Sequence, residues 1–108
     1  MAENRFYVEG RVGTEPDFRF TTGGTAVCKF SFANTYSFKQ GNEWKDRTTW
    51  FNVTIWGKKA GYAAATVKKG MALLVIGRVQ VDEWEKDGVK NKAVCIVADD
   101  FKFLNYIS

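Results

Sequence analysis

The amino-acid sequence predicts an all-β fold: a closed barrel of five strands, with one short helix between the third and fourth strands. Several long segments alternate apolar and polar residues with period two, which is typical of strands with one buried face. Glycine-, proline- and asparagine-bearing turns separate these segments, and only one segment has apolar residues at helical spacing. At 108 residues the chain predicts a single domain, residues 1–108, with one modest core.

The first three strands come before the helix. The first, within 5–13, alternates Phe6, Val8 and Val12 with polar residues, and Pro16 and Gly23–Gly24 interrupt the segment that follows it. The second is predicted within 25–38. A polar stretch, 39–47, reads as a loop or hairpin tip, and the third strand follows at 48–56.

The helix and the last two strands complete the barrel. Alanines recur at helical spacing in 58–70, where Gly61 shortens the predicted helix and Gly70 marks its end. Strands follow within 71–84 and 92–104, joined by a turn through Asp87–Gly88. Strands and helices do not alternate regularly, which argues against a doubly wound sheet and favours an OB-fold barrel (oligonucleotide/oligosaccharide-binding).

Composition narrows the class of protein. A hydrophobic share of 45% with 26% charged residues is typical of a soluble globular domain, and neither a membrane-spanning run nor a signal peptide is visible, so we expect a cytoplasmic protein without a membrane partner. The net charge of +4 permits a polyanionic partner without requiring one. Cys28 and Cys95 lie in apolar runs and are expected to be buried thiols, a disulfide between them being the less favoured alternative.

Tryptophans fall on the polar phase of two strands. In the third strand Phe51, Val53 and Ile55 form an apolar phase that faces the core. The opposite phase contains Trp50, Asn52, Thr54 and Trp56. In the strand after the helix, Trp84 shares the phase of Arg78, Gln80 and Asp82. Most strand aromatics are core or cross-strand contacts, but three on polar phases indicate an interaction surface.

Exposed aromatic rings interleaved with cations suit single-stranded nucleic acid. Unpaired bases stack on such rings for roughly 1–3 kcal/mol per base, largely independently of sequence, while cations follow the phosphates. The cations around the predicted rings are Lys29, Lys39, Lys45, Arg47, Lys58, Lys59, Lys68 and Lys69.

The chain resembles the bacterial-type single-stranded DNA-binding proteins, the SSB family, over nearly its whole length. The segment NRFYVEGRVGTEPDFRFTTGGTAVCKFSFANT is similar to that family's opening, TTWFNVTIWGKKA to its central strand and helix start, VKKG to its helix end, and GRVQVDEWEKDGVKN to its fourth strand and hairpin. These motifs occur in the family's order and spacing.

The resemblance implies site residues and partners. Base-stacking positions of the family fall on Phe38, Trp50, Trp56 and Trp84, phosphate-contacting positions on Lys58 and Lys69, and a further one on Arg19. Single-stranded DNA is the implied partner, bound without regard to sequence and without a cofactor. The implied role is in replication, recombination and repair, as a nucleoid-associated protein. The implied assembly is a homotetramer with the first strand at a subunit contact.

Three departures from the family pattern affect these expectations. Acidic residues flank Trp84 where a basic residue is common, which weakens the case for phosphate contact at that hairpin. Trp44 is an additional aromatic, either a further stacking platform or a loop-packing residue. The sequence ends at ADDFKFLNYIS without the acidic tail that recruits partner proteins in the family, so tail-mediated partners are expected only of a longer native chain.

Other classes of function remain as alternatives. The sequence has no histidine, no Cys-x-x-Cys spacing and no Walker-type loop, and neighbouring strand residues such as Asp99 and Asp100 face opposite ways, so we expect no enzyme. A single-stranded RNA-binding barrel is the runner-up, because stacking barely distinguishes the two sugars. A primosome-type accessory protein is a third possibility, although it would be expected to lack some stacking aromatics.

Overall fold

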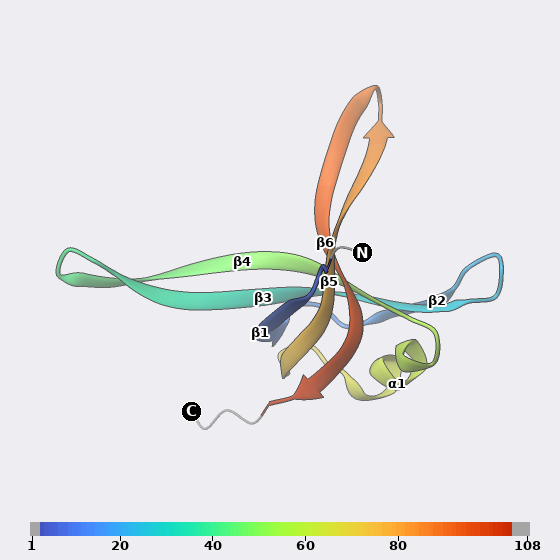
Figure 1. The fold of residues 1–108 in the computed structure, drawn as a ribbon, viewed down its shortest axis with the longest axis horizontal. Helices are drawn as coiled ribbons and strands as arrows, with labels where there is room; N and C mark the ends of the chain where they lie inside the picture. Colours follow the sequence, from blue (N-terminus) through green and yellow to red (C-terminus); the bar gives the residue numbers. More distant parts are fainter. Residues whose placement is uncertain (1–2, 105–108) are drawn as a thin grey trace.

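Six strands and one helix make up the computed structural model, which describes residues 3–104 (Figure 1). The elements are β1 (Phe6–Val12), β2 (Asp17–Phe20), β3 (Ala26–Gln40), β4 (Glu43–Trp56), α1 (Lys58–Thr66), β5 (Ala72–Lys86) and β6 (Val89–Phe103).

Five of the strands close into a barrel. The pairing order is β1-β5-β6-β4-β3, and β1 also pairs with β3, which completes the ring. All pairs are antiparallel except β4 with β6, which run parallel. The predicted five-stranded OB-fold barrel with a helix before its fourth strand is therefore confirmed. The short β2 is an addition that pairs with β3 alone, in the segment that the sequence predicted to be interrupted by turns.

The core is formed by the predicted apolar phases. Its largest fully buried side chains are Phe32, Ile55, Leu73, Ile96, Val53, Val67 and Val75. The helix closes the barrel by burying Ala60 and Ala63. It ends at Thr66 rather than near Gly70 as predicted, because Val67 adopts an extended backbone and places its own side chain in the core.

Hairpins extend from the barrel as arms, and Figure 1 shows the β3–β4 arm and the β5–β6 arm pointing in different directions. Their length explains a radius of gyration of 15.7 Å, compared with about 13 Å for a compact chain of this size. The β5–β6 arm turns through Asp87 and Gly88, both at positive φ, as predicted from that dipeptide.

The β3–β4 arm corrects the prediction of a loop over 39–47. The strands pair as far as Gln40 and Glu43, so only the two residues between them form the tip. Polar cross-strand contacts support this pairing: the Ser37 hydroxyl donates to the Asp46 carboxylate at 2.6 Å, and Thr35 and Thr48 hydroxyls lie 2.8 Å apart. Polarity thus indicated exposure of the arm, and not the absence of strands.

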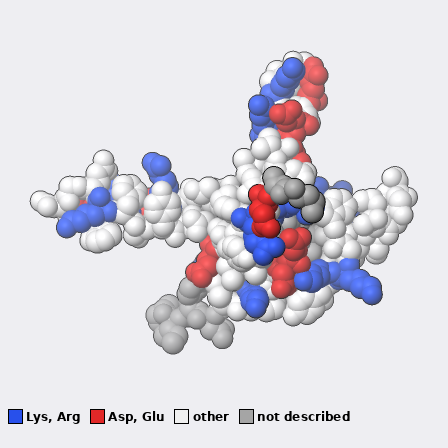
Figure 2. All heavy atoms as spheres, in the orientation of Figure 1, with Lys and Arg blue, Asp and Glu red and all other residues white. Residues whose placement is uncertain are grey.

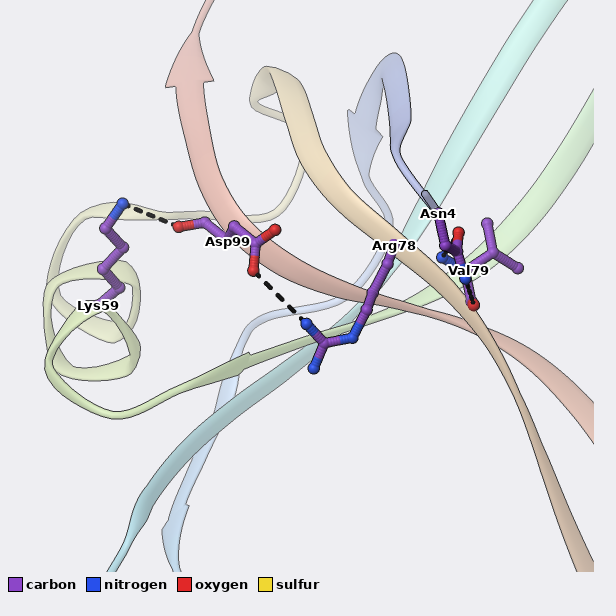
Figure 3. Close-up of polar contacts among 5 residues, drawn as sticks. All are labelled: Asn4, Lys59, Arg78, Val79 and Asp99. Carbon is purple, nitrogen blue, oxygen red and sulfur yellow. Dashed lines mark hydrogen bonds and ion pairs between the residues drawn. The ribbon is translucent and has the colours of Figure 1, made fainter. Parts of the chain in front are cut away.

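Polar contacts join the N-terminal segment and the helix to the barrel (Figure 3). Asn4 donates its side-chain amide to the Val79 carbonyl at 2.8 Å and accepts from the Val79 N–H at 3.2 Å. Lys59 of α1 donates to the Asp99 carbonyl at 2.8 Å and pairs with the Asp100 carboxylate at 3.2 Å, whereas the Asp99 carboxylate faces Arg78 at 3.9 Å. The two carboxylates therefore have different cationic partners. Across the described residues, no helix is long and apolar enough to cross a membrane.

Candidate nucleic-acid interface

Three tryptophans lie on the outward-facing phase of their strands, as predicted: Trp50 and Trp56 on β4, and Trp84 on the part of β5 that extends into the β5–β6 arm. Their exposed fractions are 61% for Trp50, 46% for Trp56 and 48% for Trp84. On the opposite phase of β4, Val53 and Ile55 are buried and Phe51 is half-buried. The three indole rings are thus available to a partner while the barrel core is filled by other side chains.

A groove of about 460 Å³ runs across this outer surface beside Trp84. The parallel register of β4 and β6 places Asn52 opposite Cys95, and β3 and β5 flank this central pair. The residues that line the groove are Thr14, Lys29, Phe30, Ser31, Asn52, Val53, Thr54, Asp82, Trp84, Ala93 and Cys95. The groove therefore has a mixed aromatic, polar and charged lining, open to solvent.

Thr54 departs from the predicted phase pattern. It lies on the outer face between Trp56 and Asn52, yet only 8% of it is exposed. The reason is that β4 is an inner strand at this point, with Lys29 of β3 on one side and Val97 of β6 on the other. Thr54 thus belongs to the floor of the groove.

Trp50 lies close against the loop between β1 and β2. A Cβ atom on Gly13 would be 2.4 Å from the Trp50 ring, so any other residue at this position would clash with the ring where it now lies. The next residue, Thr14, fixes the loop to β3: its hydroxyl accepts from the Ser31 N–H at 3.1 Å and lies 3.4 Å from the Ser31 hydroxyl. The loop therefore supports one side of this exposed indole.

The β3–β4 arm divides the remaining predicted aromatics between two faces. The register places Trp44 on the same face as Trp50 and Trp56, and 71% of Trp44 is exposed at the arm's tip, which argues against the loop-packing interpretation. Phe38 pairs with Lys45 on the opposite face and lies 6.2 Å from the Tyr36 ring. Phe38 therefore does not lie on the face of the arm that carries the tryptophans.

The predicted phosphate-binding cations are all exposed, but their surroundings differ. Lys29 lines the groove, and Lys58 begins α1 directly after Trp56 and Gly57. The backbone N–H of Lys69 donates to Glu15, which places Lys69 at the loop that supports Trp50. In the described part of the chain, none of these three lysines forms an ion pair.

Of the two other predicted cations, Arg47 lies on the β3–β4 arm and Arg19 on the short strand β2. Arg47 lies over the Phe38 ring at 6.0 Å, a cation–π distance, on the face away from the tryptophans. Arg19 of β2 is paired with the neighbouring Asp17 at 3.0 Å. The structure therefore gathers Lys29, Lys58 and Lys69 near the tryptophans and places Arg47 on the opposite face of its arm. Arg19 lies in register with Val27, which is itself opposite Trp56, so it is on the same face as Trp56, two strands away.

A polar cluster on the groove wall was missed by the sequence analysis. Asp82 accepts a hydrogen bond from the Cys95 thiol at 2.9 Å through one oxygen and from the Gln80 amide at 2.9 Å through the other. These two bonds lower the pKa of Asp82, in that order of importance. Burial and then the Asp82 hydrogen bond raise the pKa of Cys95 to about 11. At neutral pH the cluster presents a carboxylate and a neutral thiol.

The pairing register of the Asp87–Gly88 hairpin could have revealed this cluster, because it places Gln80 opposite Cys95. Both cysteines are free thiols in the structure, as the sequence analysis favoured, with Cys28 wholly buried. Farther along the β5–β6 arm, Glu83 pairs with Lys92 at 3.6 Å. Figure 2 shows acidic and basic side chains next to one another on this arm. Across the described residues, no three His, Cys, Asp or Glu side chains are placed to hold a metal ion.

The fold and this surface define an OB-fold protein with an open, aromatic-lined groove. Residues 3–104 match the Single-strand binding protein family, and the chain belongs to that family. It is 36% identical over 106 residues to a single-stranded DNA-binding protein of Neisseria meningitidis, which covers 96% of this chain and 61% of that protein. A single-stranded DNA-binding protein of Aquifex aeolicus is 32% identical, over 94% of this chain and 70% of its own length.

Solved structures show the same fold. A Plasmodium falciparum SSB in complex with single-stranded DNA superposes with a TM-score of 0.88 at 25% identity, covering 97% of both chains. A small single-stranded DNA-binding protein from Streptomyces coelicolor gives a TM-score of 0.81 at 26% identity, covering 95% of both chains. The chain spans about three fifths of the length of the Neisseria relative.

Proposed function

We propose that this chain binds single-stranded DNA without regard to sequence. Trp50, Trp56 and Trp84 would stack on bases, and Lys29, Lys58 and Lys69 would contact phosphates. The observation that carries the proposal is the exposure of the three tryptophans on one outer surface that a groove also crosses. Flat rings at intervals along a surface suit a flexible strand, whose unpaired bases expose their π-faces, better than a rigid duplex.

Several finer features belong to the same proposal. Trp44 extends the stacking surface along the β3–β4 arm, and Phe38 with Arg47 offers a second face of that arm to a longer strand. Arg19 contributes at the edge of the binding surface by adding to the electrostatic attraction between the positively charged chain and the DNA backbone. Binding requires no metal or nucleotide, and the protein acts by covering DNA rather than by catalysis.

The cellular context is proposed by analogy with the family. The chain would assemble as a homo-oligomer, most simply a tetramer, with β1 at a subunit contact. It would act in the cytoplasm at the nucleoid, protecting strands exposed in replication, recombination and repair.

A competition assay tests the proposal. A fluorescein-labelled oligo(dT) is bound to the protein and then displaced with unlabelled oligo(dT), with an RNA oligomer of matched length and with duplex DNA, while anisotropy is recorded. We expect single-stranded DNA to compete best and duplex DNA worst. Equal competition by RNA would favour an RNA-binding barrel instead, and equal competition by duplex DNA would contradict stacking as the binding mode.

A further inference from the structure

The groove carries one cation and one anion on opposite walls. Lys29 projects from β3, and Asp82 projects from β5, with Asn52 of β4 and Cys95 of β6 between them. The two charged groups influence each other: after the hydrogen bonds from Cys95 and Gln80, the Lys29 charge further lowers the pKa of the Asp82 carboxyl. A bound strand with a negatively charged backbone therefore meets attraction on one wall and repulsion on the other.

This charge arrangement would orient a bound strand across the groove. Phosphates are favoured beside Lys29 and disfavoured beside Asp82, so the bases would point toward the β5 wall. That wall carries Trp84 two residues beyond Asp82 on the same strand face, about 7 Å away along the strand. A base that stacks on Trp84 consequently has its polar edge near a carboxylate.

Asp82 is prepared to accept further hydrogen bonds. A carboxylate offers about four acceptor positions, and Cys95 and Gln80 occupy one on each oxygen while fixing the side chain in place. An ionised carboxylate has no proton to donate, so it can bind only base groups that carry N–H. At position 4 of the ring, cytosine carries an amino group that can donate to the carboxylate, whereas thymine carries an acceptor oxygen that the carboxylate repels and has only its ring N3–H as a donor.

We propose that Asp82 is a specificity-determining residue, which accepts a hydrogen bond from the exocyclic amino group of the base stacked on Trp84 and favours cytosine over thymine there. The inference rests on the proposed function and adds a base preference at one position to binding that is otherwise independent of sequence. Asn52 cannot supply the same preference, because its amide both donates and accepts.

The test compares affinities for oligo(dC) and oligo(dT) of equal length at pH 8, measured by competition against a labelled oligomer. Each protein is described by the ratio Kd(dT)/Kd(dC). The ratio of a variant is compared with that of the wild type, because intrinsic differences between the two oligomers then cancel. Asp82→Asn keeps the shape of the side chain but adds a donor that can pair with thymine. We expect it to lower the ratio by about fivefold, the effect of one hydrogen bond of ordinary net strength. Asp82→Ala, which removes the acceptor, should lower it as well.

Glu83→Gln is the matched control. It removes one negative charge from the adjacent residue, which points to the other face of the arm and pairs with Lys92. We expect this variant to change both affinities together and to leave the ratio within about twofold. An unchanged ratio in both Asp82 variants, or an equal fall in Glu83→Gln, would overturn the inference while leaving the proposed function intact. If the wild type bound neither oligomer, the proposed function itself would fail.

Discussion

Trp50 shows how a single residue can be free for binding without weakening the fold. Its ring lies against Gly13 on the outer face of β4, opposite to the face of Val53, and 61% of the residue is exposed. Few of its contacts therefore involve the core, and a partner that covers it removes apolar surface from water. Its neighbour Ile55, five residues along the same strand, is 1% exposed and belongs wholly to the core.

The first prediction follows from this contrast. Trp50→Ala should weaken binding of oligo(dT) by roughly 1–3 kcal/mol and leave the free energy of unfolding nearly unchanged. Ile55→Ala should instead lower the free energy of unfolding by about 2–5 kcal/mol and leave the affinity of the folded protein for oligo(dT) nearly unchanged. Affinity is measured by anisotropy and stability by urea denaturation. If Trp50→Ala unfolded the protein instead, its ring would have to be counted as core.

Cys95 offers a second prediction, because Asp82 disfavours its thiolate. Burial and the Asp82 hydrogen bond raise the thiol pKa to about 11, so the reactive thiolate is scarce at pH 8 and becomes abundant only near pH 11. Asp82→Asn should lower this pKa and speed alkylation by iodoacetamide, by about threefold for each unit of pKa lost, since a less basic thiolate is also less nucleophilic. Peptide mass spectrometry follows the rate, with the wholly buried Cys28 as internal control. Slower labelling of Cys95 in the variant would contradict the assigned hydrogen bond.

Among elements, the loop between β1 and β2 acts on binding through Trp50. Gly13→Ala would place a Cβ atom 2.4 Å from the ring and 2.6 Å from the Ser31 hydroxyl, so the exposed ring must move. We expect weaker oligo(dT) binding, by up to the roughly 1–3 kcal/mol attributed to one stacked base, and an altered tryptophan emission. Gly23→Ala is the control, because its Cβ would meet nothing closer than 3.9 Å. Equal affinities in the two variants would show that the loop does not position the ring.

The helix α1 gives a prediction about stability alone. Gly61 lies inside this nine-residue helix, is exposed, and has open space where a Cβ would be. Gly61→Ala should raise the free energy of unfolding by about 0.5–1 kcal/mol, since glycine loses more backbone freedom on folding than alanine does. Urea denaturation measures the gain, and unchanged affinity for oligo(dT) is expected alongside it. A loss of stability would mean that the helix needs glycine for packing.

The elements also show how far the sequence alone could go. Strand phase was enough to assign Val53 and Ile55 to the core and Trp50 to the surface, because the pleat alternates strictly. Phase could not reveal that Phe38 and Trp44 lie on opposite faces of one arm, since that depends on the register between β3 and β4. The interpretation of 39–47 as a loop failed for a related reason. A two-stranded arm outside the barrel has no buried face, so it lacks the apolar alternation that identifies a strand.

At the scale of the whole molecule, the barrel brings together groups that are distant in sequence. The predicted order of strands and helix was sufficient for the OB fold, which the barrel pairings confirm. The groove itself could not be read from the sequence, because it forms where the parallel contact of β4 with β6 brings Asn52 beside Cys95, 43 positions along the chain (95 − 52). The same packing explains why Thr54 is buried although it lies on the face that strand phase predicted to be exposed.

Intrinsic tryptophan fluorescence during titration with oligo(dT) tests the central claim most directly, since the proposed binding groups are themselves the reporters. We predict that emission falls to a plateau as the rings stack on bases. We also predict that the affinity weakens with salt, with a log–log slope of about −0.7 for each phosphate neutralised. The contradictory result is an emission that stays constant at oligo(dT) concentrations where anisotropy shows saturation, because bases would then be bound somewhere other than on the tryptophans.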